Sequence, residues 1–153
     1  MSRCSVRRLG PEQLAEMRGV NRLFATEFDD EASYAAAPPS DSYLRRLLGN
    51  EHCVVLCAEA GGAVIGALVA YELEKFEQAR SEFYIYDLAV ARRSRRQGVA
   101  TALIEALRAH AASRGGWVIF VQADHVDPPA SALYEKLGVR EEVLHFDLAV
   151  KPG

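Results

Sequence analysis

YIYDLAV at residues 84–90, followed by a short basic loop and RRQGVATALIEAL at residues 95–107, decides the fold of this chain. The first segment is apolar or aromatic apart from one aspartate, which is typical of a strand covered on both faces. The second has the spacing of an amphipathic helix, so Gly98 and Ala100 stand where a strand passes into a helix. The first N–H groups of a helix have no partner within it and lie at the positive end of its dipole, and small residues let an anion approach them. This junction is therefore predicted to bind an anionic group such as a pyrophosphate.

Length and composition favour one soluble domain. A chain of 153 residues is long enough to bury a sizeable core, and we expect residues 1–153 to fold as one unit. Half of the residues are hydrophobic and 25% are charged, which is ordinary for a globular protein. No apolar run approaches the roughly 20 residues that span a bilayer, and the N-terminus lacks the apolar segment of a secretory signal. We therefore expect a cytoplasmic protein without a membrane partner.

Charge and cysteine content exclude further classes. The net charge of −3 argues against nucleic acid as a partner. Basic side chains gather at residues 92–96, whereas carboxylates gather at residues 27–31 and again at Asp124 and Asp127. This split suits one anionic and one cationic ligand. The cysteines lack the spacing of a metal site, so no metal is expected and all three are interpreted as buried thiols: Cys4, Cys53 and Cys57.

Periodicity and turn signals predict the remaining elements. Gly61 and Gly62 separate two strands by two residues, which predicts a hairpin. The strand–helix–strand order around residues 99–113 predicts a parallel strand pair with a right-handed crossover. The sequence therefore predicts an α/β fold in which a mixed, mostly antiparallel sheet has a central parallel pair and helices on both faces. Strands are expected at residues 3–9, 52–60, 63–74, 83–90, 117–124 and 139–150, and helices from Pro11, from Ser40 to Leu48, at residues 99–113 and from Pro128 to Gly138.

Three short motifs follow one another in the second half of the chain: L-A-V at residues 88–90, R-R-Q-G-V-A at 95–100 and A-x-x-x-Y-x-K-x-G at 130–138. In this order they resemble the acyl-donor strand, the pyrophosphate loop and the final helix of the GNAT superfamily of N-acetyltransferases. Further segments, among them KFEQARSE, VQAD and LYEKLGVREEVLHFD, are similar to the type I aminoglycoside 3-N-acetyltransferases, the gentamicin-modifying branch. That similarity covers most of residues 5–148.

The resemblance implies a single N-acetyltransferase domain whose parallel strand pair is splayed to admit acetyl-CoA as cosubstrate. It implies acetyl transfer to the 3-amino group of the deoxystreptamine ring of an aminoglycoside such as gentamicin, hence antibiotic resistance, and it implies a homodimer. Three positions depart from the commonest superfamily pattern: Ala100 replaces a second Gly, Val139 a Phe, and Asp127 an Asn that contacts the coenzyme. The positions implied to bind the coenzyme are Leu88, Ala89, Val90, Arg95, Arg96, Gln97, Gly98, Val99, Ala100 and Thr101.

Asp87 and Tyr134 are the candidate catalytic residues. Asp87 lies in an otherwise apolar strand, and a buried carboxylate needs a partner or a function. We interpret it as the group that holds the acceptor ammonium and accepts its proton; the alternative is a structural hydrogen bond to a neighbouring loop. Strict strand alternation turns Asp87 and Leu88 to opposite faces, so the catalytic role depends on a local bulge. The resemblance implies that Tyr134 protonates the departing thiolate, and the alternative is a core aromatic.

Acidic residues beyond the next predicted strand are candidates for acceptor binding. Asp124 and Asp127 are predicted to bind acceptor amines, since each charge-assisted contact to a polycationic sugar contributes about 1.5–3 kcal/mol. The acidic run at residues 27–30 lies near the acceptor site if the resemblance holds, but such a run is also typical of solvated surface. Trp117 and Phe120 are interpreted as core residues.

Other functions stay open at this point. The arginine cluster is also compatible with a nucleic-acid patch or a solvated loop, but its place directly before a helix favours the pyrophosphate and 3′-phosphate of CoA. The enzyme could instead acetylate a polyamine or a protein amine, or the chain could be a non-catalytic CoA-binding module. No cysteine or serine stands in a pattern that would activate it as a nucleophile, so direct attack in a ternary complex is expected.

Overall fold

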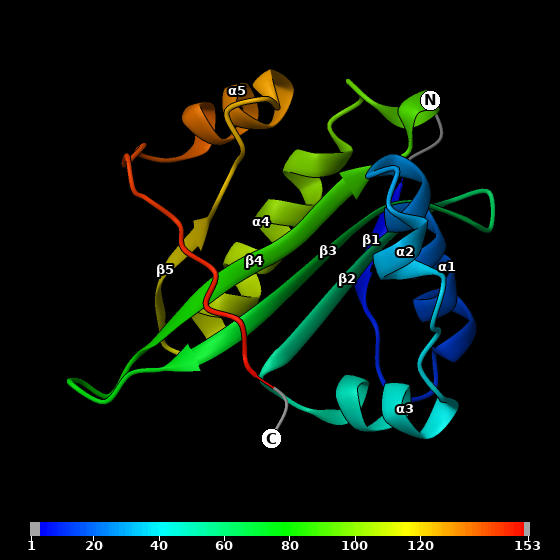
Figure 1. Ribbon diagram of the computed structural model, residues 1–153, viewed down its shortest axis with the longest axis horizontal. Coiled ribbons are helices and arrows are strands. Elements are labelled where there is room, and N and C mark those ends of the chain that lie inside the picture. Colours follow the sequence, from blue (N-terminus) through cyan, green and yellow to red (C-terminus); the bar gives the residue numbers. More distant parts are fainter. Residues whose placement is uncertain (1–3, 152–153) are drawn as a thin grey trace. The chain divides into compact units, whose positions relative to one another are not determined.

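The computed structural model describes residues 4–151, which form two compact units, residues 4–121 and residues 122–151. The first unit contains the sheet and most of the helices (Figure 1). Its elements are β1 (Ser5–Arg8), α1 (Leu14–Glu27), α2 (Glu31–Tyr34), α3 (Asp41–Gly49), β2 (Cys53–Ala60), β3 (Ala63–Glu74), β4 (Ser81–Val90), the 3₁₀ turn η1 (Arg92–Ser94), α4 (Val99–Ser113) and β5 (Gly116–Val121).

The sheet has the strand order β1-β2-β3-β4-β5. Neighbouring strands are antiparallel except β4 and β5, which are parallel and joined through α4. The predicted hairpin between β2 and β3 is confirmed, because Gly61 and Gly62 have φ values of 57° and 77°, the left-handed conformation that a two-residue turn requires. The α/β fold class is confirmed as well.

Helices cover both faces of the sheet. Side chains of α1 and α3 pack on the face that carries Cys53, Val55 and Val69, and Val20 and Phe24 are almost fully buried there. On the opposite face α4 lies so close to β3 that a Cβ atom added to Gly66 would stand 2.8 Å from Cγ1 of Val99. The start of α4 is therefore held firmly against the sheet.

A β-bulge interrupts the pairing of β3 with β4. Val69 pairs with Asp87 and the next residue of β3, Ala70, pairs with Ile85, so Tyr86 is the extra residue. Tyr71 pairs with Tyr84, and directly paired residues point to the same face of a sheet. Since Val69 and Tyr71 share a face, Asp87 shares that face with Tyr84. This bulge lies before Asp87, whereas Asp87 and Leu88 pair with the consecutive residues Val69 and Leu68 and so still point to opposite faces; the bulge expected between Asp87 and Leu88 is not found.

The second unit contains α5 (Pro128–Leu137), which begins and ends near the predicted residues. Asp127 caps its first turn by accepting a hydrogen bond from the backbone N–H of Ala130 at 3.2 Å. The predicted strand at 139–150 is wrong, because residues 139–151 form neither a helix nor a strand. Alternating side chains define two faces of a segment, but a strand also needs a sheet edge to pair with. Within the described chain the parallel pair therefore lies at the edge of the sheet and not at its centre.

Two smaller expectations also need correction. The first helix begins at Leu14 and not at Pro11, because Gly10–Gln13 form a turn in which Oε1 of Gln13 accepts a hydrogen bond from the N–H of Gly10 at 2.6 Å. Trp117 and Phe120 are not core residues, since 54% and 36% of their surfaces are exposed. Both lie on β5, which has a partner strand on one side only. No helix within residues 4–151 is long and apolar enough to cross a membrane.

Candidate active site

The parallel strands β4 and β5 separate before β4 ends. Their last paired residues are Ile85 and Val121, whereas β4 continues to Val90. In the described part of the chain, the backbone of Tyr86–Val90 therefore has a partner strand only on the side of β3. This free edge includes the expected acyl-donor segment at residues 88–90. It offers N–H and C=O groups to an extended ligand in the way that a sheet edge accepts a further strand.

The free edge leads through η1 to the N-terminus of α4. Gly98 is the N-cap residue of this helix and has a φ of 80°, and a Cβ atom at this position would meet nothing within 4 Å. Arg96, two residues earlier, also has a positive φ of 61°. The first amides of α4 are thus presented to open space beside a helix dipole, which is the arrangement that binds phosphate groups.

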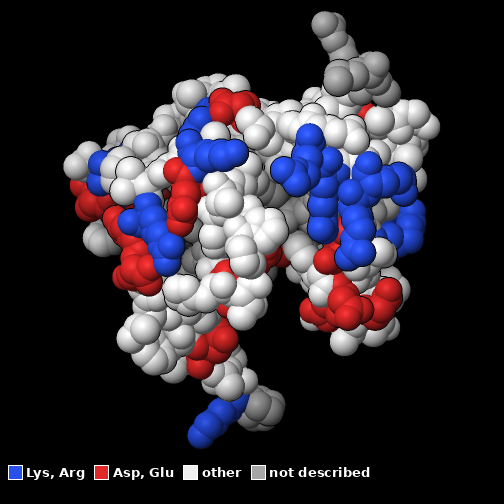
Figure 2. Space-filling view, turned by 90° about the horizontal axis from the view of Figure 1, so that it is seen from above, with Lys and Arg blue, Asp and Glu red and all other residues white. Residues whose placement is uncertain are grey.

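The basic loop before α4 is partly neutralised by α1. Arg95 forms a 2.8 Å ion pair with Glu27 and donates a second hydrogen bond to the carbonyl oxygen of Val90 at 3.1 Å. Glu27 also accepts a hydrogen bond from the backbone N–H of Arg92 at 3.3 Å. Figure 2 shows Lys and Arg side chains in several places on the viewed face, and the largest group lies next to a group of carboxylates. Arg95 therefore fastens the loop to α1 through Glu27.

Asp87 has one defined partner. The hydroxyl of Tyr34, the last residue of α2, donates a hydrogen bond of 2.8 Å to Oδ1 of Asp87. Burial raises the pKa of Asp87 above its ordinary value, and the hydrogen bond from Tyr34 offsets part of that increase. The ring of Tyr34 is held in turn by Phe24 and Phe28, whose centroids lie 5.7 and 5.6 Å away. A half-buried carboxylate with a raised pKa suits a general base.

Sequence reasoning missed Tyr34. It lies in a segment that the sequence marked only as a break after the first helix, and this segment contains the short helix α2. Asp30 caps α2 by accepting a hydrogen bond from the N–H of Ser33 at 3.0 Å. The capping pattern was a readable signal for the turn, but the partner of Tyr34 lies 53 residues away along the chain. Only the fold brings the two side chains together.

The cysteines are not suited to nucleophilic attack. Cys53 and Cys57 are buried and free, as predicted, whereas Cys4 is only partly buried. Burial and the nearby charge of Glu59 raise the pKa of Cys57 to about 12, and burial also raises the pKa of Cys53. A thiol with such a pKa is protonated at neutral pH and reacts poorly.

The other candidate residues lie in the second unit. Burial and the charge of Asp127 raise the pKa of Tyr134 to about 12, so its phenol stays protonated at neutral pH. The two carboxylates predicted to bind amines serve the local backbone: Asp124 accepts a hydrogen bond from the N–H of Val126 at 3.4 Å, and Asp127 caps α5. Their remaining lone pairs are still able to accept further hydrogen bonds.

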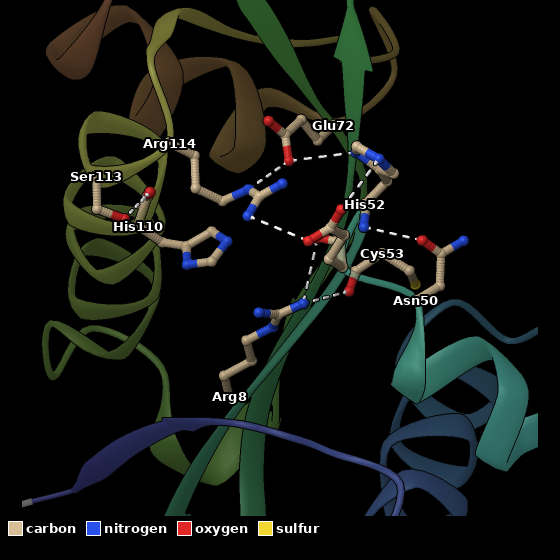
Figure 3. A network of polar contacts seen from close by, with 9 residues as sticks. Arg8, Asn50, His52, Cys53, Glu72, His110, Ser113 and Arg114 are labelled. Carbon is tan, nitrogen blue, oxygen red and sulfur yellow. Dashed lines mark hydrogen bonds and ion pairs between the residues drawn. The ribbon is translucent and has the colours of Figure 1, made fainter.

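A second polar cluster lies at the other end of α4 from Gly98. Glu72 of β3 is almost fully buried and binds Arg114, just after α4, at 2.5 Å, and its carboxylate lies 3.4 Å from Nδ1 of His52 (Figure 3). Arg8 of β1 joins the cluster through a 3.1 Å hydrogen bond to the carbonyl oxygen of Cys53. These contacts tie β1, β2, β3 and the end of α4 together. The cluster is interpreted as structural.

An open groove of about 710 Å³ borders the basic loop and is lined partly by Glu27 and Arg93 but not by Asp87. No group of three or more His, Cys, Asp or Glu side chains within residues 4–151 is arranged to hold a metal ion.

Comparisons with known proteins agree with this arrangement. The model of the acetyltransferase (GNAT) family matches residues 14–139. The crystal structure of an aminoglycoside acetyltransferase from an uncultured soil metagenomic sample is 52% identical, covers 97% of this chain and 99% of that one, and has a TM-score of 0.96. A second aminoglycoside acetyltransferase from such a sample, in complex with sisomicin, is 30% identical with 97% of both chains covered and a TM-score of 0.90. An uncharacterised N-acetyltransferase of Bacillus subtilis is 27% identical over 113 residues, which are 72% of this chain and 76% of the relative. The chain therefore belongs to the acetyltransferase (GNAT) family.

Proposed function

We propose that the protein transfers acetyl from acetyl-CoA to the 3-amino group of the deoxystreptamine ring of aminoglycosides of the gentamicin type. The observation that carries the proposal is the free edge of β4, which begins beside Asp87 and leads to the open N-terminus of α4. The family supplies the reaction class, and the relatives that are aminoglycoside acetyltransferases favour an amino-sugar acceptor. Acetylation removes a positive charge from the drug, weakens its binding to anionic RNA and would so confer resistance.

The coenzyme is proposed to bind by its two polar parts. Amides from Gln97 to Thr101 would hold the pyrophosphate at the start of α4, and Arg96 would add positive charge. Pantetheine would run along the free edge of β4, where an N–H group of residues 88–90 would polarise the thioester carbonyl as it becomes an oxyanion. The open space at Gly98 and the free edge of β4 fit such a ligand.

The acceptor reacts directly with the thioester in this proposal. Asp87 holds the acceptor ammonium, takes its proton and leaves the free amine, whose lone pair forms the new C–N bond. The C–S bond then breaks, and the phenol of Tyr134, a role that rests on its family motif, gives its proton to the departing thiolate. The nitrogen gives its second proton to the resulting phenolate, so the products are the acetylated amine, the CoA thiol and protonated Asp87. Asp124 and Asp127 are proposed to bind other amines of the acceptor with their remaining lone pairs. The high pKa of Cys57 supports a mechanism without an acyl-enzyme.

Release of CoA thiol in the presence of acetyl-CoA tests the function across gentamicin, sisomicin and spermidine. We expect turnover with gentamicin and sisomicin, and NMR of the product is expected to place the acetyl group on the 3-amine. Acetylation at another amine would correct the position but keep the reaction class. Turnover of spermidine and not of gentamicin would assign a polyamine acceptor, and coenzyme binding without turnover on any amine would indicate a non-catalytic module.

A further inference from the structure

Four aromatic rings form a row across β3, β4 and β5. The ring of Tyr71 meets that of Tyr86 edge-on at 6.0 Å, Tyr86 meets Tyr84 edge-on at 5.7 Å, and Tyr84 stacks on Phe120 at 4.7 Å with an interplanar angle of 8°. In the sheet register Tyr71 pairs with Tyr84, and Tyr84 pairs with Phe120. We call these four side chains the aromatic row.

The aromatic row lies on the face of the sheet that carries Asp87. The bulge at Tyr86 is the cause, since without it the alternation along β4 would turn Asp87 to the opposite face from Tyr84. The hydroxyl of Tyr34 marks the Asp87 end, and the negative charge of Asp87 adds to burial in raising the pKa of both Tyr71 and Tyr84. The carboxylate and the rings thus form one connected surface.

This surface is open. Tyr86 is 62% exposed, and Tyr71 and Phe120 are exposed by 37% and 36%, whereas Ile85 on the opposite face of β4 is buried. Two other exposed aromatic rings of the same unit each have an arginine beside them: the guanidinium of Arg80 lies 4.1 Å from the ring of Trp117, and that of Arg46 lies 5.1 Å from the ring of Tyr43. A contiguous set of exposed rings beside a carboxylate indicates a binding surface.

We propose that the aromatic row is the surface that receives the sugar rings of the acceptor and thereby selects cyclic amino sugars over linear amines. The proposal rests on the proposed function and extends it to the choice of substrate. An amino sugar has an apolar face of ring C–H groups that packs on an aromatic ring, and its ammonium groups are attracted to the negative face of a tyrosine ring. An ammonium group on a sugar ring that packs at the Asp87 end of the aromatic row would reach the carboxylate of Asp87. A linear polyamine carries the same charge but has no ring face to pack.

The test compares variants that keep the ring with variants that remove it. Tyr86→Leu and Tyr71→Leu keep apolar bulk but lose the aromatic face, whereas Tyr86→Phe and Tyr71→Phe lose only the hydroxyl. Phe76→Leu is the control outside the aromatic row, because Phe76 is 98% exposed in the connection between β3 and β4. Titration calorimetry with sisomicin and with spermidine measures binding, thiol release measures turnover, and thermal melting reports on the fold.

We expect the Leu variants to weaken sisomicin binding by about tenfold and to raise its KM with little change in kcat or in the KM for acetyl-CoA. The Phe variants should lose less than the Leu variants, spermidine binding should change less than sisomicin binding, and Phe76→Leu should behave like the unsubstituted protein. Equal losses in the Phe and Leu variants, or equal losses for sisomicin and spermidine, would overturn the proposal. So would unchanged sisomicin binding in both Leu variants.

The outcomes separate this proposal from the proposed function. Turnover of sisomicin that neither Leu variant affects contradicts the aromatic row alone. Sisomicin binding that depends on the rings but leads to no turnover contradicts the proposed function alone. Absence of sisomicin binding in the unsubstituted protein contradicts both, and a loss of self-association in the Leu variants without a change in sisomicin binding would assign the surface to a second copy of the chain.

Discussion

Asp87 is expected to lower the stability of the protein while serving the reaction. Its pKa is raised in the folded state, mainly by burial, so the folded protein binds its proton more tightly than the unfolded chain does. The free energy of unfolding therefore falls as pH rises from the ordinary pKa of 3.8 through the raised value. Asp87→Asn removes this fall in the free energy of unfolding. At pH 7–8 the variant should therefore melt at the same temperature as the unsubstituted protein or at a higher one. Turnover should fall by about 10²–10⁴-fold. A lower melting temperature with retained turnover would show that Asp87 is structural.

Tyr34 sets the protonation of Asp87 from the side of α2. Its hydrogen bond favours the ionised carboxylate and lowers the pKa of Asp87. Tyr34→Phe removes this bond, so the pKa should rise and the acidic limb of the profile of kcat/KM against pH should move to higher pH. Because the same acceptor is used throughout, its own amine titration cancels in the comparison. Tyr43→Phe, an exposed tyrosine on α3, is the control. An unmoved acidic limb would contradict the role of Tyr34.

At the scale of elements, the start and the end of α4 offer a matched pair of glycines. Gly98 and Gly115 have φ values of 80° and 77°, and a Cβ atom at either position would meet nothing within 4 Å. Alanine at each should therefore cost a similar 1–2 kcal/mol of stability, roughly the penalty for a left-handed L-residue. Only Gly98→Ala adds a methyl group where the pyrophosphate is proposed to bind, so only this variant should raise the KM for acetyl-CoA several-fold. Equal KM values for the two variants would place the pyrophosphate elsewhere.

Elements whose first and last residues are marked by neighbouring residues in the sequence could be predicted. Gly61 and Gly62 define the hairpin, and α4 has the predicted limits because Gly98 and the glycines after Ser113 mark its ends. Features that depend on two strands at once could not be predicted. The bulge at Tyr86 is a property of the pair β3–β4, since nothing in β4 alone shows which residue stays unpaired.

The same distinction applies to the candidate site. The segment at residues 88–90 and the loop before α4 could be predicted, because the sequence motifs lie at the predicted junction between strand and helix. The partners of these residues could not be predicted, because Tyr34 and Glu27 reach Asp87 and Arg95 only through the packing of α1 on the sheet and of α2 against α1. The same limit explains the error at residues 139–150, where alternation was correct as a pattern but no pairing follows from it.

At the scale of the whole molecule, the cluster around Glu72 is expected to set stability in acid. Burial is the largest single influence and disfavours the ionised form of Glu72, but the hydrogen bonds from Arg114 and Ser81 and the charge of Arg114 together outweigh it and leave the pKa below its ordinary value. The pair therefore stabilises the fold above the unfolded pKa of 4.5, and this contribution is lost as pH falls through the folded pKa. Glu72→Gln should cost about 3 kcal/mol at pH 7, the low end for a buried pair, because Arg114 keeps Glu51 nearby. In urea unfolding the difference should shrink below about pH 4.

The control for this prediction is Asp41→Asn. Asp41 binds Arg18 at 2.5 Å, but its side chain is 57% exposed, whereas that of Glu72 is 3% exposed. Removal of an exposed pair should cost much less stability than removal of a buried one, because solvent screens the exposed charges. A loss for Glu72→Gln no larger than that for Asp41→Asn would show that the cluster contributes little to the fold.

The segment at residues 144–150 exposes a row of apolar side chains. Leu144, Phe146, Leu148 and Val150 alternate with His145, Asp147 and Ala149 and are exposed by 84%, 76%, 89% and 95%, and His145 and Asp147 form a 2.9 Å hydrogen bond. Such a row of apolar side chains is costly in water, and we propose that a second copy of the chain covers it in a homodimer.

Sedimentation of the unsubstituted protein should give a dimer. Phe146→Ser combined with Leu148→Ser should shift it to the monomer, because each lost burial weakens association by about 1.5–3 kcal/mol. Val139→Ser, equally exposed but outside the row, should remain dimeric, and a monomeric unsubstituted protein at micromolar concentration would refute the proposal.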